Sequence, residues 1–252
     1  MLAALLLAAA TAQPDPLRSA LSAAHRDYMT QLTDKFAEAT ADPSLVGKPF
    51  KFMHSMHDGD SYSGDMGSGY YTYHDGKLRL VFIPDEKYAG AGIEGPKYMV
   101  GLIGSTRTHI RNYVGSNAFG VTRTVEVVRL DEDGLAMLDR PEGEESPYTS
   151  SGPILPSIAA RLPALPKKNY WVEMTLPGPE ARKVAMDAAL LIEGTIRALD
   201  GGKLSYCKAN YIEAQIDAPT EIYGSECWVG ANVSRIAFIR RSTGEVLKQW
   251  VK

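Results

Sequence analysis

The residues of this sequence with the most evident chemical potential lie together in one short stretch. Four of them are possible metal ligands: His54, His57, Asp58 and Asp60. Ser61 follows directly and is a possible nucleophile, because a serine attacks esters once a base removes its proton. Imidazole and carboxylate groups are ligands that zinc and other divalent metals use in proteins. The stretch therefore suggests hydrolysis, either metal-assisted at His57, Asp58 and Asp60 or based on Ser61.

A metal site here depends on where the preceding strand ends. Side chains three positions apart on a strand point to opposite faces, so His54 and His57 cannot both bind one metal from a strand. The spacing works only if the strand ends near Ser55 and a loop carries His57 to Asp60. A calcium-binding loop does not fit, because the glycine that such a loop requires falls on Ser63.

The block GDSYS, from Gly59 to Ser63, resembles the nucleophile block of the GDSL family of esterases and lipases. The resemblance implies that Ser61 is the nucleophile, and Gly115-Ser116-Asn117 resembles part of the family's oxyanion block. That family also places an Asp-x-x-His pair near the C-terminus, where the histidine is the base. The last histidine of this chain is His109, so no such pair follows Ser61.

The same stretch is also interpretable as a glycine-rich loop. Asp, Gly and Ser gather where a chain leaves one strand for the next, because they cap chain ends and tolerate positive φ angles. Strands are predicted on both sides, at residues 50–56 and 69–74. We therefore expect a long surface loop without catalytic residues, whose length still permits a role in binding.

The N-terminal part of the chain predicts one amphipathic helix within residues 13–41. Asp15 and Pro16 are typical of an N-cap followed by the first helical residue. Apolar residues then recur on one face, at Leu17, Leu21, Tyr28, Leu32 and Phe36. The helix is expected to end near Thr40, before Asp42-Pro43.

Residues 69–83 carry the clearest hairpin pattern. Asp75-Gly76 favours a two-residue turn, which sets the register of the two strands. The expected pairs are His74 with Lys77, Tyr73 with Leu78, Thr72 with Arg79, and Tyr71 with Leu80. The buried face is then expected to hold Tyr71, Tyr73, Leu78, Leu80 and Phe82, with His74 on the solvent side.

The rest of the chain indicates a mainly β fold. A second hairpin is expected at residues 121–138, turning at the acidic residues 131–134, and a short helix near 179–187. About a dozen strands without regular alternation of strands and helices favour antiparallel, sandwich-like sheets. The expected organisation is the N-terminal helix, a first β unit at 42–140, a proline-rich linker at 141–168 and a second β unit at 169–252.

Residues 1–12 are typical of a secretory signal peptide, because an uncharged apolar run ends at the small-x-small triplet Ala10-Thr11-Ala12. Cys207 and Cys227, the two cysteines of the chain, are expected to form a disulfide, since an even count in an exported chain favours one. No later apolar run is long enough to span a bilayer. The expected location is therefore the periplasm or the extracellular space, without a transmembrane segment.

The composition gives no indication of a nucleic-acid partner. The net charge of −3 provides no global basic field for nucleic acid or acidic lipid. No phosphate-binding glycine loop indicates a nucleotide, and no other cofactor is indicated. We expect a non-catalytic binding or envelope-accessory protein, whose ligand is a small molecule, a glycan or an envelope protein. The alternative is the hydrolase described above, with His54, His57, Asp58, Asp60, Ser61 and His109 as its candidate residues.

Overall fold

The computed structural model describes residues 15–33, 42–58, 69–89, 95–116, 120–145 and 168–252. Over these residues the fold is mainly β, with thirteen strands in two sheets and two α-helices. The sequence predicted this class and the approximate number of strands. Most strand pairs are antiparallel, as expected, while β2–β3 and β7–β12 are parallel.

The order along the eight-stranded sheet is β1 (Pro49–Ser55), β10 (Ala188–Ile196), β12 (Thr220–Arg240), β7 (Thr122–Asp139), β6 (Lys97–Ser116) and β5 (Asp85–Tyr88), with β11 (Ser205–Ile212) and β13 (Val246–Val251) also paired to β12. The order in the five-stranded sheet is β2 (His57–Asp58), β3 (Gly69–His74), β4 (Lys77–Phe82), β9 (Lys168–Thr175) and β8 (Glu144–Glu145). The helices are α1 (Pro16–Thr33) and α3 (Gly178–Asp187), and two short 3-10 helices are η1 (Pro43–Leu45) and η2 (Asp200–Gly202).

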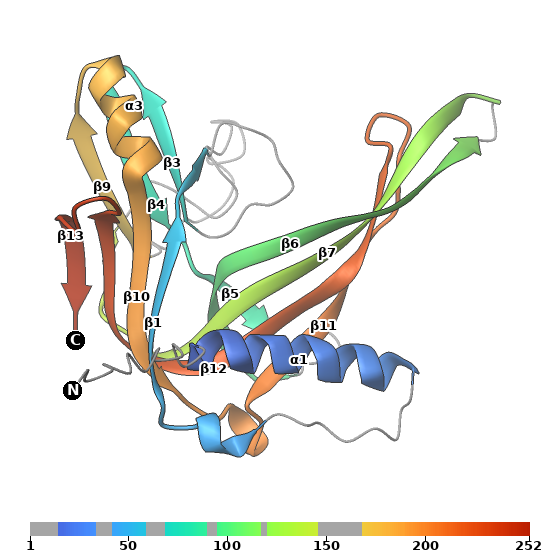
Figure 1. The fold of residues 1–252 in the computed structure, drawn as a ribbon, viewed down its shortest axis with the longest axis horizontal. Coiled ribbons are helices and arrows are strands. Elements are labelled where there is room, and N and C mark those ends of the chain that lie inside the picture. The colour runs from blue at the N-terminus through green and yellow to red at the C-terminus, as the bar shows by residue number, and fades with distance from the viewer. Residues whose placement is uncertain (1–14, 34–41, 59–68, 90–94, 117–119, 146–167) are drawn as a thin grey trace, which may run out of the picture.

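The five-stranded sheet packs against one half of the eight-stranded sheet, and we call this part of the molecule the sandwich (Figure 1). A chain of aromatic rings joins the two layers. The Tyr170 ring on β9 lies 5.9 Å from Phe82 and 5.2 Å from Trp250, centroid to centroid. Trp250 on β13 lies 5.7 Å from Phe238 on β12. Offset and edge-on ring contacts of this kind add to the hydrophobic gain of burial.

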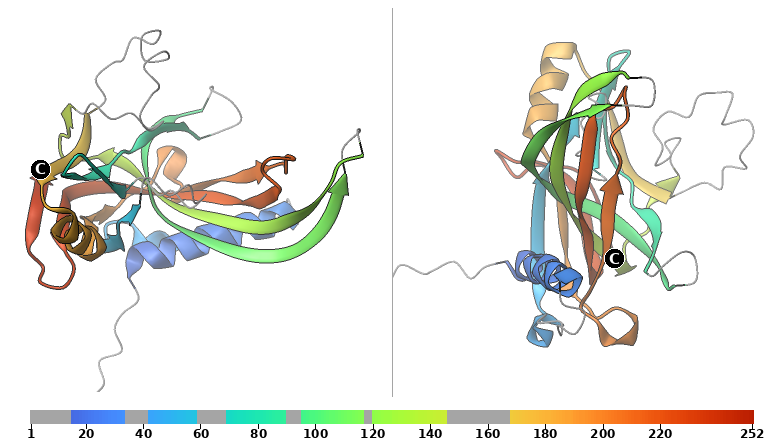
Figure 2. Two further views of the ribbon diagram at one scale, coloured as in Figure 1. Left: turned by 90° about the horizontal axis from the view of Figure 1, so that it is seen from above. Right: turned by 90° about the vertical axis from the view of Figure 1, so that its right-hand side faces the viewer.

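The other half of the eight-stranded sheet extends away from the sandwich, and we call it the arm. It consists of residues 104–116 of β6, 122–133 of β7, all of β11 and residues 220–228 of β12. Figures 1 and 2 show the arm as a long, twisted projection with α1 lying along it. The arm can form because β6, β7 and β12 are 20, 18 and 21 residues long, far beyond the usual strand length.

Helix α1 confirms the first part of the predicted amphipathic helix. Leu17 and Leu21 are buried, as expected of its apolar face. Leu32 on the same predicted face is 60% exposed, because it lies towards the end of the arm. The remainder of the predicted helix, including Phe36, lies outside the described residues.

The β3–β4 hairpin has the predicted register in every pair. Asp75 and Gly76 both have positive φ, 52° and 73°, as a two-residue hairpin turn requires. The prediction of the buried face was correct for β4 and only partly correct for β3. Leu78 and Leu80 are fully buried, whereas Tyr73 is exposed and donates a hydrogen bond to the Leu176 carbonyl.

The second predicted hairpin was wrong, because β7 runs without a turn from Thr122 to Asp139. The acidic residues that suggested a turn have partners in the structure. Asp131 accepts hydrogen bonds from Ser225 and Arg129, and Glu132 accepts one from Asn210. Gly134 lies under Trp228, where a Cβ atom would approach the indole to 2.6 Å. The glycine is therefore required by packing and not by a turn.

Strands from residues 42–140 and 169–252 pair with one another in both sheets, so the two predicted β units share one core. The short helix α3 confirms the prediction near 179–187. The predicted linker contributes β8 to the smaller sheet, and its residues 146–167 lie outside the described part. Among the described helices, none is both long and apolar enough to cross a membrane.

Candidate functional site

The structure describes only part of the predicted chemical stretch. β1 ends at Ser55, and His57 and Asp58 form β2 in the other sheet, so the chain does leave the strand where the metal hypothesis required it. Asp60 and Ser61 lie outside the described residues. Among the described residues, no three His, Cys, Asp or Glu side chains group as metal ligands.

His54 and His57 are brought close enough for the charge of one to affect the other. Burial lowers the pKa of His57, the charge of His54 lowers it further, and Asp58 opposes these effects. Burial also lowers the pKa of His54, with a smaller effect from Arg18. The His57 ring lies 6.0 Å from that of Tyr70, and its buried Nε2 atom has no hydrogen-bond partner among the described residues. Both imidazoles are therefore neutral at neutral pH.

His109 lies apart from these histidines, on the exposed part of β6 in the arm. Its Nε2 atom is 3.1 Å from Asn112 Oδ1. His57 belongs to the five-stranded sheet and His109 to the eight-stranded sheet. The structure therefore groups His54, His57 and Asp58, and places His109 in a different environment.

A serine, a histidine and two aspartates that the sequence did not group meet under α1. His25 Nδ1 lies 2.8 Å from Ser225 Oγ, and His25 Nε2 lies 3.0 Å from Asp133 Oδ1. The Ser225 hydroxyl also donates to Asp131 Oδ1 at 2.9 Å. The Ser225 hydroxyl has one proton, and the roles of the two His25 nitrogens as donor or acceptor follow from the tautomer of the ring.

This cluster, which we call the His25 cluster, holds α1 on the arm and is not suited to nucleophilic catalysis. Ser225 is fully buried, so a substrate cannot reach its hydroxyl, and the hydroxyl proton is already donated to Asp131. One sequence signal could have located the cluster. His25 follows Leu21 by four residues, so it shares the buried face of the predicted helix.

A second buried charge lies on the opposite face of β12. Glu226 binds Lys87 and Lys208 and accepts a hydrogen bond from Trp228 Nε1 at 2.8 Å. Burial raises the pKa of this carboxyl, but the attraction and hydrogen bond of Lys87 and the charge of Lys208 outweigh burial and lower it overall. The His25 cluster and the buried Glu226 cluster both lie at the start of the arm.

A groove of about 720 Å³ lies between the end of α1 and the arm, and we call it the arm groove. Its walls are mainly apolar and come from five elements: Met29 and Leu32 of α1, Ile110 of β6, Val127 of β7, Tyr211 of β11 and Tyr223 of β12. Tyr211 and Tyr223 lie side by side in the wall because they are cross-strand partners, and their rings are 5.2 Å apart.

Two arginines line the same groove and differ in their partners. Arg129 donates from Nε to Asp131 Oδ2 at 2.6 Å, so a carboxylate already neutralises it. Arg111 lies 5.9 Å from the Tyr113 ring and pairs with no carboxylate among the described residues. The groove thus combines apolar and aromatic walls with one cation available to a ligand, which suits a small apolar or amphipathic molecule.

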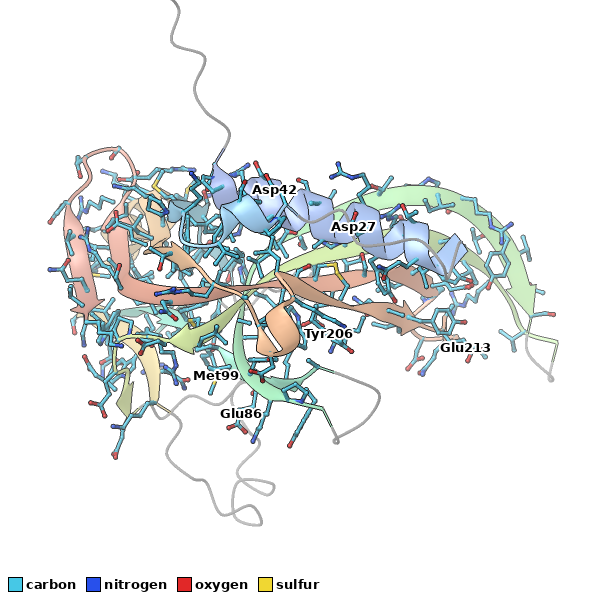
Figure 3. The ribbon with its side chains drawn as sticks, turned by 90° about the horizontal axis from the view of Figure 1, so that it is seen from below. Asp27, Asp42, Glu86, Met99, Tyr206 and Glu213 are labelled. Carbon is cyan, nitrogen blue, oxygen red and sulfur yellow. A yellow bond between two sulfur atoms is a disulfide. The ribbon has the colours of Figure 1, made fainter. Side chains whose placement is uncertain are left out.

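A smaller cavity of about 440 Å³ lies on the other side of α1, beside η2 and the start of β11. Figure 3 labels two of the residues that line it, Asp27 on α1 and Tyr206 on β11. Asp27 is mostly buried, and the wall also includes Cys207 of the disulfide. The residues that line this cavity are more polar than those that line the arm groove.

Comparisons with family models, with curated proteins and with solved structures found no match to this chain. The assignment of function therefore rests on the geometry of the site alone.

Proposed function

We propose that this chain is an exported, non-catalytic binding protein that takes a small apolar or amphipathic ligand in the arm groove. The observation that carries the proposal is the groove itself. Apolar side chains that could have been buried in a core instead line a concavity of about 720 Å³, which is within the usual size range of ligand pockets. Leu32 and Ile110, which are 60% and 54% exposed, would lose contact with water when a ligand binds.

Export to the periplasm or the extracellular space is part of the proposal. The apolar run before Gln13 supports it, and so does the Cys207–Cys227 disulfide, because disulfides persist in oxidising compartments. N-terminal sequencing of the exported protein should begin at Gln13. An intact Met1 on cytosolic protein would contradict export.

The test of the groove is a titration with 1-aminoanthracene, a neutral apolar fluorophore. We expect saturable binding at one site, and about ten-fold weaker binding in a Leu32→Ser/Ile110→Ser variant, because both changes remove apolar area from the wall. The matched control is Met186→Ser on α3, which removes a similarly exposed apolar side chain outside the groove. Equal loss in both variants, or no binding by the wild type, would reject the groove as the site.

The hydrolase remains the alternative function, and one observation favours it. Burial lowers the pKa of His57, and its buried Nε2 atom has no partner among the described residues; the stretch that contains Ser61 follows soon after in the sequence. A fluorophosphonate probe separates the two functions. The binding proposal predicts no labelling of the mature protein, whereas labelling that disappears in Ser61→Ala would establish a serine hydrolase.

A further inference from the structure

The β6–β7 hairpin of the arm differs in charge from the rest of the chain. From Gly95 to Val125 the sequence contains no Asp or Glu, although the whole chain has 30 acidic residues against 27 Lys and Arg. Four cations lie in this segment: Lys97, Arg107, Arg111 and Arg123. The end of the hairpin is therefore basic, whereas the part of β7 that follows it carries Glu126, Asp131, Glu132 and Asp133.

Two of these cations lie on one face and are available to a partner. Tyr113 is the cross-strand partner of Val125, and Arg111 and Arg123 each lie two residues from one member of that pair. Strand alternation therefore places Arg111, Tyr113 and Arg123 on the same face. Neither arginine pairs with a carboxylate among the described residues, whereas Arg107 is bound to Glu126 at 2.8 Å.

Apolar side chains accompany the cations at the end of the hairpin. Val114 is 72% exposed, and Ile110, Tyr113 and Val121 are also exposed. Residues 106–114 and 120–124 are exposed on both faces of the ribbon. The interface of a lipid bilayer accommodates side chains of these kinds: exposed valine beside arginine and tyrosine.

The shape of the arm determines which part of the protein would meet a lipid surface first. Figure 1 shows that the β6–β7 hairpin extends past the loop between β11 and β12, where the acidic Glu213 and Asp217 lie. Figure 2 shows the same projection from two further directions. A flat anionic surface would therefore meet the basic hairpin before the acidic loop.

A bilayer suits this end of the arm better than a folded protein does. A stable protein interface buries about 800 Å² per partner, which a two-stranded ribbon end does not readily provide. A bilayer accepts a few apolar side chains and adds roughly 1 kcal/mol per basic residue near an anionic surface. We propose that the end of the β6–β7 hairpin docks the protein on an anionic lipid surface, through Arg111, Arg123, Val114 and Val121. This inference does not depend on ligand binding in the arm groove.

The test is co-sedimentation of the mature protein with lipid vesicles. We expect binding to phosphatidylcholine vesicles containing about 30% phosphatidylglycerol, little binding to phosphatidylcholine alone, and a decrease as salt is added. Arg111→Gln/Arg123→Gln should lower the partition coefficient roughly 30-fold on the anionic vesicles. The matched control is Arg182→Gln/Lys183→Gln on α3, which removes two exposed cations elsewhere and should bind as the wild type does.

A second variant tests the apolar part of the contact without changing the charge. Val114→Ser/Val121→Ser lies outside the arm groove and should weaken vesicle binding while leaving 1-aminoanthracene binding unchanged. Three results would overturn the docking proposal: no binding of the wild type to anionic vesicles, equal loss in the α3 control, or a salt-sensitive dimer that the arginine variant abolishes. The dimer would assign the hairpin to contact with a second copy of the chain.

Discussion

The sandwich and the arm share the long strands β6, β7 and β12, yet they differ in how far they bury their apolar side chains. On β4 in the sandwich, Leu78 and Leu80 are fully buried between two layers. On β6 in the arm, Ile110 and Val114 face solvent, and the polar His25 cluster and a disulfide hold the sheet together. The difference suggests two tasks: the sandwich contributes most of the buried core, and the arm carries the surfaces that we propose bind partners.

The largest difference between the two regions should appear when an aromatic side chain is truncated in each. Phe238→Ala leaves a cavity beside Trp250 and should lower the free energy of unfolding by about 4 kcal/mol. Tyr211→Ala, in the exposed wall of the arm groove, should cost less than about 1 kcal/mol. Urea denaturation measures both values. Similar losses would mean that the arm contributes to the core as much as the sandwich does.

Removing the disulfide should have the next largest effect on stability, because the bond links β11 to β12 within the arm. Cys207 and Cys227 are cross-strand partners, 20 residues apart in the chain. Replacing both with serine removes a restriction on the unfolded chain and should lower the free energy of unfolding by about 3 kcal/mol. Unfolding of the wild type in dithiothreitol should give the same loss. Free thiols detected by mass spectrometry in the exported protein would instead show that the bond does not form.

His25→Ala should have a smaller effect, concentrated where α1 meets the arm. The change leaves Asp133 and Ser225 without their imidazole partner and should cost about 2 kcal/mol. Hydrogen exchange should accelerate in α1 while the five-stranded sheet keeps its protection. Arg26→Ala, on the exposed side of the same turn, is the control. It should leave the free energy of unfolding and the hydrogen exchange of α1 unchanged.

The last effect should depend on pH, because it is present near neutral pH and fades in acid. The lowered pKa of Glu226 means that its pairing with Lys87 and Lys208 contributes stability above the unfolded value of 4.5, which is lost as the pH falls towards the folded pKa. Glu226→Gln should therefore remove part of the decrease in unfolding free energy below pH 4.5. Glu142→Gln breaks an exposed ion pair and is the variant with which Glu226→Gln is compared. An unchanged acid profile in Glu226→Gln would show that the cluster does not couple stability to pH.

The sequence predicted those features of the fold that depend on neighbouring residues. Asp75-Gly76 determined the register of the β3–β4 hairpin because a two-residue turn leaves one choice of pairing. The continuous β7 could not be predicted in the same way. The partners of Asp131 and Asp133 are Ser225 and His25, 94 and 108 residues away in the chain, so the acidic run looked like a turn.

The candidate site was not predictable from local patterns either. The sequence drew attention to residues 54–61, where catalytic residue types are close in the chain. The arm groove is instead lined by ordinary apolar residues such as Leu32, Ile110 and Tyr223, which come together only when α1 packs against β11 and β12. Catalytic residue types can be recognised in a sequence. An apolar groove is formed by common residues, and their types do not mark it.

If ligands bind the arm and not the sandwich, as we propose, hydrogen exchange with and without saturating 1-aminoanthracene should differ only in the arm. We predict added protection in the strands that line the arm groove, around Ile110, Val127, Tyr211 and Tyr223, and no change in the five-stranded sheet. Protection confined to the five-stranded sheet, or to β2 beside His57, would contradict the account and return attention to residues 54–61.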